Sequence, residues 1–436
     1  MENSLFESKL ASYPEPANKL GVLTEDFLFW YQNGTKRQLN LQDVVGTSLV
    51  DNGDGELPSL LVTAYPKRIG LLVKKSRRIL QKYYFTCSNL KERAQWQKAI
   101  NNTLIGQPID AVVKRRRLQV IINPISGKRQ ATQIFETVRP LFDHSNVEYK
   151  VTQTKSTLDT KNLVRDLNLF ELDGLVIVGG DGTIHDVIAG LMSRPDWEQA
   201  IKLPLGIIPG GTGNGFCKTL LESAVESYNP LNAAFLVVKG RHKSFDLAAV
   251  TQGDRLYYSF LSVSWGLISD VDIESEKFKF LGALRFDLYA LLLIISLRTY
   301  HGRFSFIPHP DCKMYSPKAA GKEKWQVIED EFIFLWGMNT AWAAHDMNVT
   351  PHARIDDGAI DVLVMRKGTS RLEIVTALLR CGKGQHLNSP HLEYYKVQEF
   401  HLEPLTERGI LVVDGESVDY LPIKIKVVPN LARVNG

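Results

Sequence analysis

Hydrophobic and polar positions follow three different patterns along the 436-residue chain. In the first part, short apolar runs alternate with polar turns and end in a helical pattern over residues 89–104 that carries Trp96. Short strands separated by turn residues are typical of an antiparallel β domain. The pattern therefore predicts a small β-rich domain over residues 1–110, closed by one helix. The clearest predicted strands are residues 27–30, 59–62 and 83–86.

The second pattern covers residues 117–243 and alternates apolar strands with helical segments. Three of its strands run into turns that contain glycine. Residues 120–128 read VIINPISGK, residues 176–183 read VIVGGDGT and residues 205–214 read LGIIPGGTGN. Strands that alternate with helices predict a parallel sheet, in which such turns meet at the carboxyl edge. We therefore expect the three turns to form one site.

The chemistry of these turns suits a phosphate. Glycine lets the backbone approach a ligand closely, and the start of a helix attracts anions. Asp181 lies beside this anion site, where a carboxylate would be repelled unless a metal ion or a substrate hydroxyl needs it. A lone GGDG sequence would equally fit a tight turn with an aspartate cap, but here three such turns recur. None of them is a Walker A loop or a GxGxxG fingerprint.

The third pattern, over residues 244–436, has longer apolar runs, such as residues 332–336 and 360–364. It predicts a second β-rich domain. Within it, residues 281–297 form a helical segment that is apolar on nearly every face but too short and too charged at its ends to span a membrane. A helix that is apolar all round is either buried or in contact with lipid.

Positive charge is concentrated in the first part of the chain. The whole chain has a formal net charge of +4, whereas residues 1–117 carry 18 lysines and arginines against 11 acidic residues. The clusters at residues 67–68, 74–75, 77–78 and 114–117 suit an anionic membrane surface, or equally a solvated strand face and a linker. Aromatic residues do not interleave with them, so we do not expect nucleic acid as a partner.

The cysteines and the first residues bear on the cellular compartment. The four cysteines are far apart and lack the spacing of a metal site, so we expect reduced thiols. The opening segment does not have the charged-then-apolar pattern of a signal peptide. We therefore expect a cytoplasmic protein with peripheral membrane association.

The motifs NPxSGK, GGDGTxxD and PGGTGN, in this order, resemble the diacylglycerol kinase-like superfamily of lipid kinases. Residues 260–300 narrow the resemblance to sphingosine (long-chain base) kinases, and KGQH at 383–386 and VDGE at 413–416 match late motifs of the same family. The resemblance extends over residues 117–428. It implies a Rossmann/phosphofructokinase-like α/β nucleotide-binding domain over residues 117–243 and a lipid-binding β-sandwich over residues 244–436. The last strand of the sandwich is a candidate to return to the catalytic domain.

The first part of the chain resembles a pleckstrin-homology-like (PH-like) domain, because its strands are closed by one helix with an inward-facing Trp96. Domains of this kind often precede lipid kinases. The resemblance therefore implies a membrane or regulatory role for residues 1–110.

The family resemblance also implies a catalytic site that uses ATP and Mg²⁺. Asp181 would take the proton from the attacking hydroxyl, as a true base or as a positioning group. Lys279 stands where the family usually has Arg, and lysine keeps the positive charge but loses the bidentate geometry of arginine. Asp186 stands where relatives often have Glu. The implied ATP-binding residues are Asn123, Ser126, Thr154, Gly179, Gly180, Gly182, Asp186, Thr212, Gly213, Asn214, Lys279, Arg285, Asp414, Gly415 and Glu416, of which Asp414 and Glu416 would also hold the metal.

A long-chain base (sphingosine, dihydrosphingosine or phytosphingosine) is the implied substrate. Asp270 and Asp272, two residues apart, would point the same way on a strand, and the resemblance assigns the ammonium group to Asp272. His386 is either near the head group or structural. The implied substrate-binding residues are Ser262, Leu267, Ile268, Val271, Asp272, Phe286, Ala290 and His386.

Three other kinds of protein remain in competition. A ceramide or diacylglycerol kinase would have no ammonium group to pair with Asp272. An NAD kinase shares GGDGT but needs no apolar helix like residues 281–297. A non-catalytic lipid-binding adaptor would keep the turns only as parts of the fold. The oligomeric state stays open.

Overall fold

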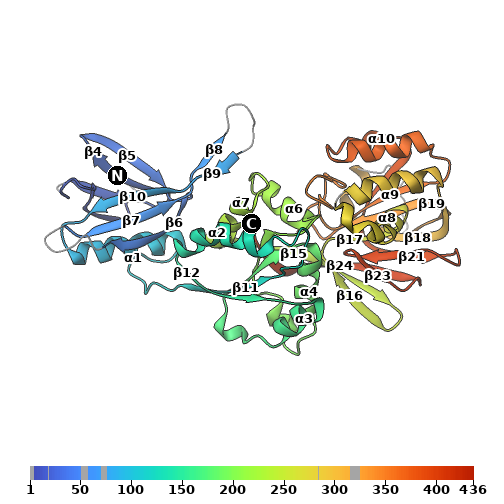
Figure 1. The fold of residues 1–436 in the computed structure, drawn as a ribbon, viewed down its shortest axis with the longest axis horizontal. Helices are drawn as coiled ribbons and strands as arrows, with labels where there is room; N and C mark the ends of the chain where they lie inside the picture. Colours follow the sequence, from blue (N-terminus) through green and yellow to red (C-terminus); the bar gives the residue numbers. More distant parts are fainter. Residues whose placement is uncertain (1–3, 18, 51–56, 70–75, 283, 315–324) are drawn as a thin grey trace.

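The computed structural model describes residues 4–17, 19–50, 57–69, 76–282, 284–314 and 325–436. Figure 1 shows three units in a row: a β-rich N-terminal unit, a central unit with helices around a parallel sheet, and a β-rich C-terminal unit. The N-terminal unit contains β1 (Phe6–Lys9), β2 (Ala11–Ser12), β3 (Leu20–Leu23), β4 (Phe27–Gln32), β5 (Thr35–Asn40), β6 (Val44–Val50), β7 (Ser59–Ala64), β10 (Gln81–Thr86), the hairpin β8 (Lys67–Ile69)–β9 (Ser76–Arg78), and helix α1 (Leu90–Leu104).

One helix closes the sheet of the N-terminal unit, as the sequence predicts. The sheet has the order β1-β3-β4-β2-β10-β7-β6, with β5 beside β4. Helix α1 begins where the Asn89 side chain accepts a hydrogen bond from the backbone N–H of Glu92 at 2.9 Å. On its inner face, Trp96 is fully buried and meets the edge of Phe6.

The central unit is built on the parallel strands β12 (Val147–Gln153), β11 (Arg116–Ile122), β13 (Gly174–Gly179) and β14 (Leu205–Pro209), in that order. Alternate residues of these strands belong to two separate hydrophobic clusters, so both faces of the sheet are buried. This explains the unbroken apolar runs in the sequence. The helices are α2 (Ala131–Asp143), α3 (Thr157–Arg165), α4 (Asp181–Met192), α5 (Trp197–Ala200), α6 (Gly215–Ser223) and α7 (Pro230–Lys239), with a 3₁₀ turn at Leu169–Glu171.

The C-terminal unit continues the same sheet. Its last strand, β24, pairs with β15 and β21 and also joins the central unit, where Val434 lies opposite Leu205 of β14. The strands are β15 (His242–Gln252), β16 (Arg255–Ser259), β17 (Ser262–Gly266), β18 (Tyr300–Pro308), β19 (Gln326–Met338), β20 (Ile360–Arg366), β21 (Leu392–Pro404), β22 (Leu411–Val413), β23 (Glu416–Val418) and β24 (Ile423–Asn435). The helices are α8 (Leu267–Glu274), α9 (Leu284–Ile295) and α10 (Arg371–Cys381), with 3₁₀ segments η2 (Ser275–Leu281), η3 (Pro310–Met314) and η5 (Gln385–Asn388).

Two expectations about the region after β17 were wrong. Asp270 and Asp272 lie on helix α8 and not on a strand, because Gly266 adopts a φ of 78° and turns the chain from β17 into the helix. Two residues on a helix are about 200° apart around the axis, so the two carboxylates point in different directions. The helix predicted over residues 281–297 is shorter in the structure, where α9 follows the separate segment η2. It is not buried on all sides, because Leu288 and Leu292 are more than half exposed.

The basic clusters are not all at the surface either. Arg78 is only 8% exposed and pairs with Asp43 and Glu226, while Lys74 and Lys75 lie outside the described residues. All four cysteines are buried and unpaired by disulfides, as expected. Among the described residues, none of the helices is long and apolar enough to cross a membrane.

Candidate active site

The three glycine-containing turns lie against one another at the carboxyl edge of the parallel sheet, as the sequence predicts. A Cβ atom on Gly127 would lie 2.7 Å from the carbonyl carbon of Gly211, and one on Gly180 would lie 3.0 Å from the Gly211 Cα and 3.2 Å from the Ser126 hydroxyl. Gly127 also has a φ of 53°. Because a side chain at Gly127 or Gly180 would collide with Gly211, the glycines are what let the turns meet.

Asp181 lies in the middle of this junction. It begins α4, and its carboxylate reaches the start of α6, where it accepts hydrogen bonds from the backbone N–H groups of Gly215 at 2.9 Å and Phe216 at 3.3 Å. Burial, with a smaller contribution from the charge of Asp414, raises the pKa of Asp181 to about 6 despite these bonds. A carboxylate with a pKa near neutrality can accept a proton from a hydroxyl group.

The loop at residues 210–214 is folded back on itself. The Asn214 side chain accepts a hydrogen bond from the Gly211 N–H at 2.9 Å and donates one to the Gly211 carbonyl at 2.8 Å. Asn214 has a φ of 55°, and a Cβ on Gly213 would lie 3.3 Å from the Asp181 carboxylate. Thr212 and Gly213 are therefore presented beside Asp181 at the start of α6, a position that favours anions.

The first turn is tied to the second by side chains. Asn123 donates a hydrogen bond from its amide to the Thr183 hydroxyl at 3.0 Å. A Cβ on Gly179 would lie 2.6 Å from that same hydroxyl, while Gly182 has open space around it. Thr154, which follows β12, is 2% exposed and donates its N–H to the Ile122 carbonyl at 2.9 Å.

Asp414 connects the central and C-terminal units. One of its oxygens accepts hydrogen bonds from the Ser259 hydroxyl at 2.7 Å and from the N–H groups of Leu261 and Ser262. The other accepts one from the Phe260 N–H at 3.1 Å and lies 3.2 Å from Nδ1 of His185 on α4. These hydrogen bonds hold the buried Asp414 side chain and fix the turn at residues 414–416 beside His185 of α4.

Asp272 borders the same turn. Its carboxylate oxygen lies 4.0 Å from where a Cβ of Gly415 would stand. The pKa of Asp272 is raised to about 6, mainly by burial. The charge of Arg285 lowers this pKa, and the charges of Glu276 and Glu416 raise it. Arg285 stacks on the Phe286 ring at 4.4 Å, and its Nη1 atom is buried without a hydrogen-bond partner among the described residues. The cluster therefore has a donor available for a phosphate.

Asp270 and Asp186 have their own partners. Asp270 accepts a hydrogen bond from Tyr300 and lies 3.5 Å from Arg298, within the C-terminal unit. Asp186 is 5% exposed and lies 3.6 Å from Lys161 of α3, and burial raises its pKa. The ATP contact predicted for Asp186 stays a prediction. The Lys279 side chain lies outside the described residues.

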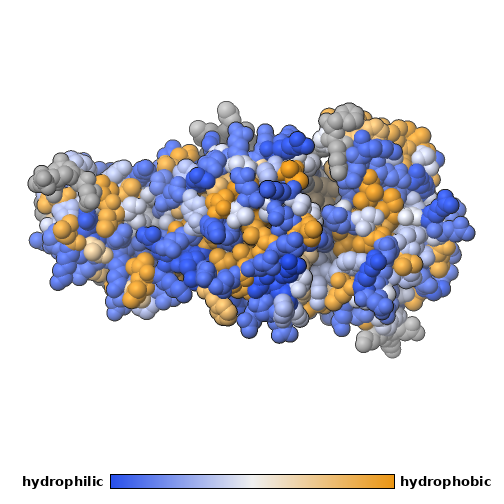
Figure 2. All heavy atoms as spheres, turned by 60° about the horizontal axis from the view of Figure 1, so that its bottom comes forward, coloured by the Kyte–Doolittle hydropathy of each residue, from blue (hydrophilic) through white to orange (hydrophobic). Residues whose placement is uncertain are grey.

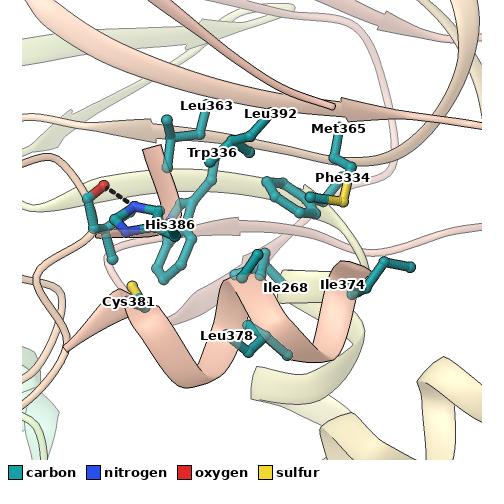
Figure 3. Close-up of a pocket in the computed structure, with 12 residues that line it drawn as sticks. Ile268, Phe334, Trp336, Leu363, Met365, Ile374, Leu378, Cys381, His386 and Leu392 are labelled. Carbon is teal, nitrogen blue, oxygen red and sulfur yellow. Dashed lines mark hydrogen bonds between the residues drawn. The ribbon is translucent and has the colours of Figure 1, made fainter. Parts of the chain in front are cut away.

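A small apolar cavity of about 30 Å³ lies between α8, α10 and strands β19 and β20 (Figure 3). Its walls include Ile268, Phe334, Trp336, Leu363, Met365, Ile374, Leu378 and Cys381. His386 lines the cavity too. Its Nε2 lies 2.7 Å from the Val349 carbonyl, its Nδ1 is buried without a hydrogen-bond partner among the described residues, and burial lowers its pKa. His386 is therefore a neutral histidine in an apolar environment.

The predicted tail-binding residues are only partly gathered at this cavity. Ile268 lines it, and Leu267 and Val271 belong to the same hydrophobic cluster. Phe286 lies under Arg285, and Ala290 is half-buried on α9. Neither lines the cavity. Ser262 is held by Asp414, as described above.

Metal ligation was predicted for Asp414 and Glu416. Among the described residues, no group of three His, Cys, Asp or Glu side chains is placed to hold a metal ion. Both oxygens of Asp414 already accept hydrogen bonds, and the metal contact predicted for Asp414 stays a prediction. Glu416 is exposed, and its charge acts on both Asp272 and Asp186. Mg²⁺ in phosphoryl-transfer sites is often held by one or two carboxylates together with substrate phosphates, and Glu416 meets that requirement.

Comparison with known proteins identifies the family. Residues 117–250 match the diacylglycerol kinase catalytic domain, and residues 326–436 match the YegS C-terminal NAD kinase beta sandwich-like domain. Sphingosine kinase 1 of Arabidopsis thaliana is 36% identical, with 75% of this chain and 72% of the relative aligned. The chain belongs to the sphingosine kinase family. Sphingosine kinase 1 of Homo sapiens is 31% identical over 74% of this chain and 92% of its own length.

Solved structures agree with this family at the level of the fold. A putative diacylglycerol kinase from Bacillus anthracis str. Sterne superimposes with a TM-score of 0.57 at 23% identity, covering 75% of this chain and 97% of the bacterial chain. The central unit and the C-terminal β-sandwich therefore form a diacylglycerol kinase-like fold. The N-terminal β-rich unit precedes the matched family regions, which begin at residue 117.

Sequence reasoning overlooked several residues of this sphingosine kinase family site. His185, which contacts Asp414, lies inside the GGDGTIHD motif next to Asp186, so its position beside known motif residues was the available signal. Phe334 and Trp336, like Leu363 and Met365, are two residues apart on a strand and share a face. This two-residue spacing indicates that the side chains of each pair share one face of the sheet, but it does not show that α8 and α10 cover that face.

Proposed function

We propose that this protein transfers the γ-phosphoryl group of ATP to the primary hydroxyl of sphingosine and related long-chain bases. One observation carries the proposal: two carboxyl groups whose pKa values are raised to about 6 are both linked to the turn at residues 414–416, since Asp272 borders Gly415 and the charge of Asp414 acts on Asp181. Asp181 belongs to the phosphate-binding turns, whereas Asp272 belongs to the apolar C-terminal unit. The pair suits a reaction between a nucleotide and a cationic lipid.

In this mechanism, the glycine turns bind the triphosphate. Backbone N–H groups at the start of α4 and in the loop at residues 212–213 face the phosphates, as helix N-termini do in other nucleotide sites, while the N–H groups of Gly215 and Phe216 hold Asp181. Arg285, with its unpaired Nη1, stabilises charge on the transferring group, and Lys279 is proposed to assist it. Asp181 orients the lipid hydroxyl and accepts its proton as the oxygen attacks the γ-phosphorus. Asn123, Ser126, Thr154 and Asp186 complete the proposed nucleotide site.

We propose Glu416 as the carboxylate that meets Mg²⁺. When bound with the nucleotide, the ion would neutralise part of the phosphate charge. We propose that Asp414 supports the metal site indirectly, because its hydrogen bonds with residues 259–262 and His185 hold Gly415 and Glu416 in place.

Asp272 distinguishes a long-chain base from ceramide or diacylglycerol. A buried carboxylate with a raised pKa gains most from a cationic partner, and only the long-chain bases carry an ammonium group. The apolar cavity beside Ile268 suits the aliphatic chain. Because small-molecule pockets measure roughly 300–1,000 Å³, side chains of α8 or α10 must move before a long chain can enter.

We further propose that the protein associates with membranes through α9. Its outer face carries Leu284, Leu288, Leu291, Leu292 and Ile295, each at least half exposed, beside exposed Leu372 and Leu379 of α10. Figure 2 shows hydrophobic surface on the C-terminal unit, with further hydrophobic patches on the other two units. An apolar patch next to a lipid-binding site suits a bilayer that supplies the substrate. The basic clusters of the N-terminal unit have a smaller part in this proposal, since Arg78 is buried.

The proposed domain organisation follows the three units. Residues 1–110 form a PH-like domain, supported by the strands closed by α1 and by buried Trp96. Residues 117–243 form the nucleotide-binding domain and residues 244–436 the lipid-binding domain. Residues 423–435 return to the nucleotide-binding domain through β24.

A radiolabelled ATP assay tests the function directly. The full chain is incubated with Mg²⁺ and, separately, sphingosine, dihydrosphingosine, phytosphingosine, ceramide, diacylglycerol or NAD. We expect labelled product from the three long-chain bases and none above the Asp181→Asn background from the others. Labelling of ceramide or diacylglycerol at a comparable rate would contradict the role of Asp272, and no labelled lipid at all would contradict kinase activity.

A further inference from the structure

The turn between α6 and α7, residues 224–229, is held by the N-terminal unit. Glu226 lies 2.7 Å from Arg78 and 3.4 Å from Lys67, both on the β8–β9 hairpin. The backbone N–H of Ser76 donates a hydrogen bond to the Ser227 hydroxyl at 2.8 Å. Figure 1 shows the hairpin beside α7, so two residues 151 positions apart in the sequence meet here.

The ion pair at this contact is buried and specific. Arg78 and Glu226 are 8% and 6% exposed. The Arg78 guanidinium also donates to Asp43 at 2.9 Å and lies 3.5 Å from the centre of the Phe235 ring on α7. Removing one partner of a buried ion pair leaves the other charge uncompensated, so this contact tolerates little rearrangement.

The hairpin is not the whole interface. Val45 and Tyr65 of the N-terminal unit belong to the same hydrophobic cluster as Phe235 and the strands of the parallel sheet. Lys239, at the end of α7, donates hydrogen bonds to the carbonyls of Leu41 at 3.0 Å and Val44 at 2.8 Å. Because apolar packing and ionic contacts act together, the N-terminal unit is fixed against α7 and the turn before it.

The other side of the turn reaches the phosphate-binding loop. Tyr228, two residues after Glu226, stacks on His345 with 5.4 Å between ring centroids and 20° between planes. The His345 backbone N–H donates to the Gly213 carbonyl at 2.8 Å. Burial raises the pKa of Tyr228, and both Asp181 and Asn214 act on its phenol group.

We infer that the N-terminal unit positions the loop at residues 210–214 through this turn, with Tyr228 as the positioning residue. Helix α6 connects the loop to the turn directly, and Tyr228 with His345 supports the loop from the side. Ordering a binding loop before the ligand arrives removes part of the entropic cost of binding. The inference rests on the proposed assignment of this loop to the nucleotide, and predicts that a contact in the N-terminal unit changes affinity for ATP.

Two variants of the full-length protein test the inference. Arg78→Met removes the charge at the interface but keeps an unbranched side chain, and Tyr228→Leu removes the ring on the other side of the turn. Leu28→Ala is the matched control for stability, because Leu28 is fully buried in the N-terminal unit but belongs to a different cluster. Arg37→Met, on the exposed strand β5, is the control for loss of an arginine.

The first measurement is amide hydrogen exchange without any nucleotide, so it does not depend on the proposed function. We expect faster exchange at residues 210–214 in Arg78→Met and Tyr228→Leu, but not in Leu28→Ala or Arg37→Met. The second is steady-state kinetics. Coupling between sites changes affinity by roughly 5- to 150-fold, so we expect KM for ATP to rise about tenfold in both test variants, with KM for sphingosine within twofold of the original protein.

The outcomes separate the two ideas. Faster exchange with no kinase activity in any variant would uphold the positioning and contradict the proposed function. Unchanged exchange and unchanged KM for ATP in both Arg78→Met and Tyr228→Leu would overturn the positioning, even if both lower the melting temperature. If Arg78→Met does not fold, Glu226→Gln takes its place, because it removes the same ion pair with a side chain of the same size.

Discussion

At the scale of single residues, the site depends on carboxylates with different partners. Asp181 and Asp272 have raised pKa values because they are removed from water without a full complement of donors. Asp414, by contrast, has its two oxygens occupied by five donors. These different environments support the proposed roles, in which Asp181 accepts the proton, Asp272 binds the ammonium group and Asp414 holds the turn at residues 414–416.

Replacing Asp181 by Asn should lower kcat about 10²-fold or more, since a positioned acid/base group contributes this much. ATP affinity should stay nearly unchanged, and the melting temperature should not fall, because the charged carboxylate is itself costly to bury. Kinetics, nucleotide titration and thermal unfolding on the same preparation check this. A variant with nearly normal kcat would remove Asp181 from the mechanism.

The pH dependence of kcat follows from the same residue. Because the pKa of Asp181 is raised to about 6, the carboxyl group is mostly protonated below this pH and cannot accept a proton. We expect kcat to rise as the pH increases through about 6 and then to level off. An acid limb near pH 4, where an ordinary aspartate titrates, would contradict a buried Asp181 as the acceptor.

Asp272→Asn and Asp270→Asn form a matched pair. Breaking a buried charge pair costs roughly 3–5 kcal/mol, so Asp272→Asn should raise KM for sphingosine strongly and leave KM for ATP nearly unchanged. Asp270 pairs with Tyr300 and Arg298, so Asp270→Asn should lower the melting temperature with little change in either KM. The reverse pattern would place the ammonium group at Asp270.

At the scale of helices and strands, α9 has two faces with different consequences. Leu293 and Ile294 are buried, whereas Leu288 and Leu292 are 52% and 56% exposed. The inner face stabilises the C-terminal unit, and the outer face is free to meet lipid. Hydrophobicity alone does not distinguish these faces.

Substitutions on the two faces of α9 should separate these roles. Leu288→Ser together with Leu292→Ser should weaken sedimentation with vesicles while leaving activity on micellar sphingosine and the melting temperature nearly unchanged. Leu293→Ala should lower the melting temperature and leave sedimentation of the folded protein with vesicles nearly unchanged, since such core substitutions destabilise by about 2–5 kcal/mol. Equal vesicle binding by the double serine variant and the original protein would exclude the outer face as the membrane contact.

The elements that sequence predicted correctly are those with local causes. The parallel strands and the glycine turns follow from apolar runs and from glycine at defined positions, so both were found. Helix α8 was missed because it depends on the positive φ of Gly266, which is not visible in the pattern of apolar residues. The burial of Arg78 was missed because its partner Glu226 is distant in the sequence, and a cluster of basic residues looks the same whether solvated or paired.

At the scale of the whole molecule, the central and C-terminal units share one sheet. Strand β24 places Ala432 and Val434 in the core of the central unit, while Ile423 and Ile425 belong to the core of the C-terminal unit. The two units therefore cannot separate as rigid bodies without breaking this strand. We expect them to unfold together in one thermal transition.

Val434→Asp and Arg433→Asp test this expectation with the same introduced group at adjacent positions. Val434 is fully buried and Arg433 is exposed. The buried, unpaired carboxylate in Val434→Asp should destabilise both units and abolish activity, whereas Arg433→Asp should behave like the original protein. Loss of one transition with the other retained would show that the units fold independently.

The same strand has a consequence for biosynthesis. Leu205 and Val434 are neighbours in the sheet, yet the ribosome adds the residues between them over about ten seconds or more at typical elongation rates. Throughout that interval the edge of β14 lacks its final neighbour, and an open strand edge is a site for wrong pairing. A nonsense mutation between residues 209 and 434 leaves this edge of β14 permanently open, so it should yield an aggregating chain and not merely a shortened enzyme.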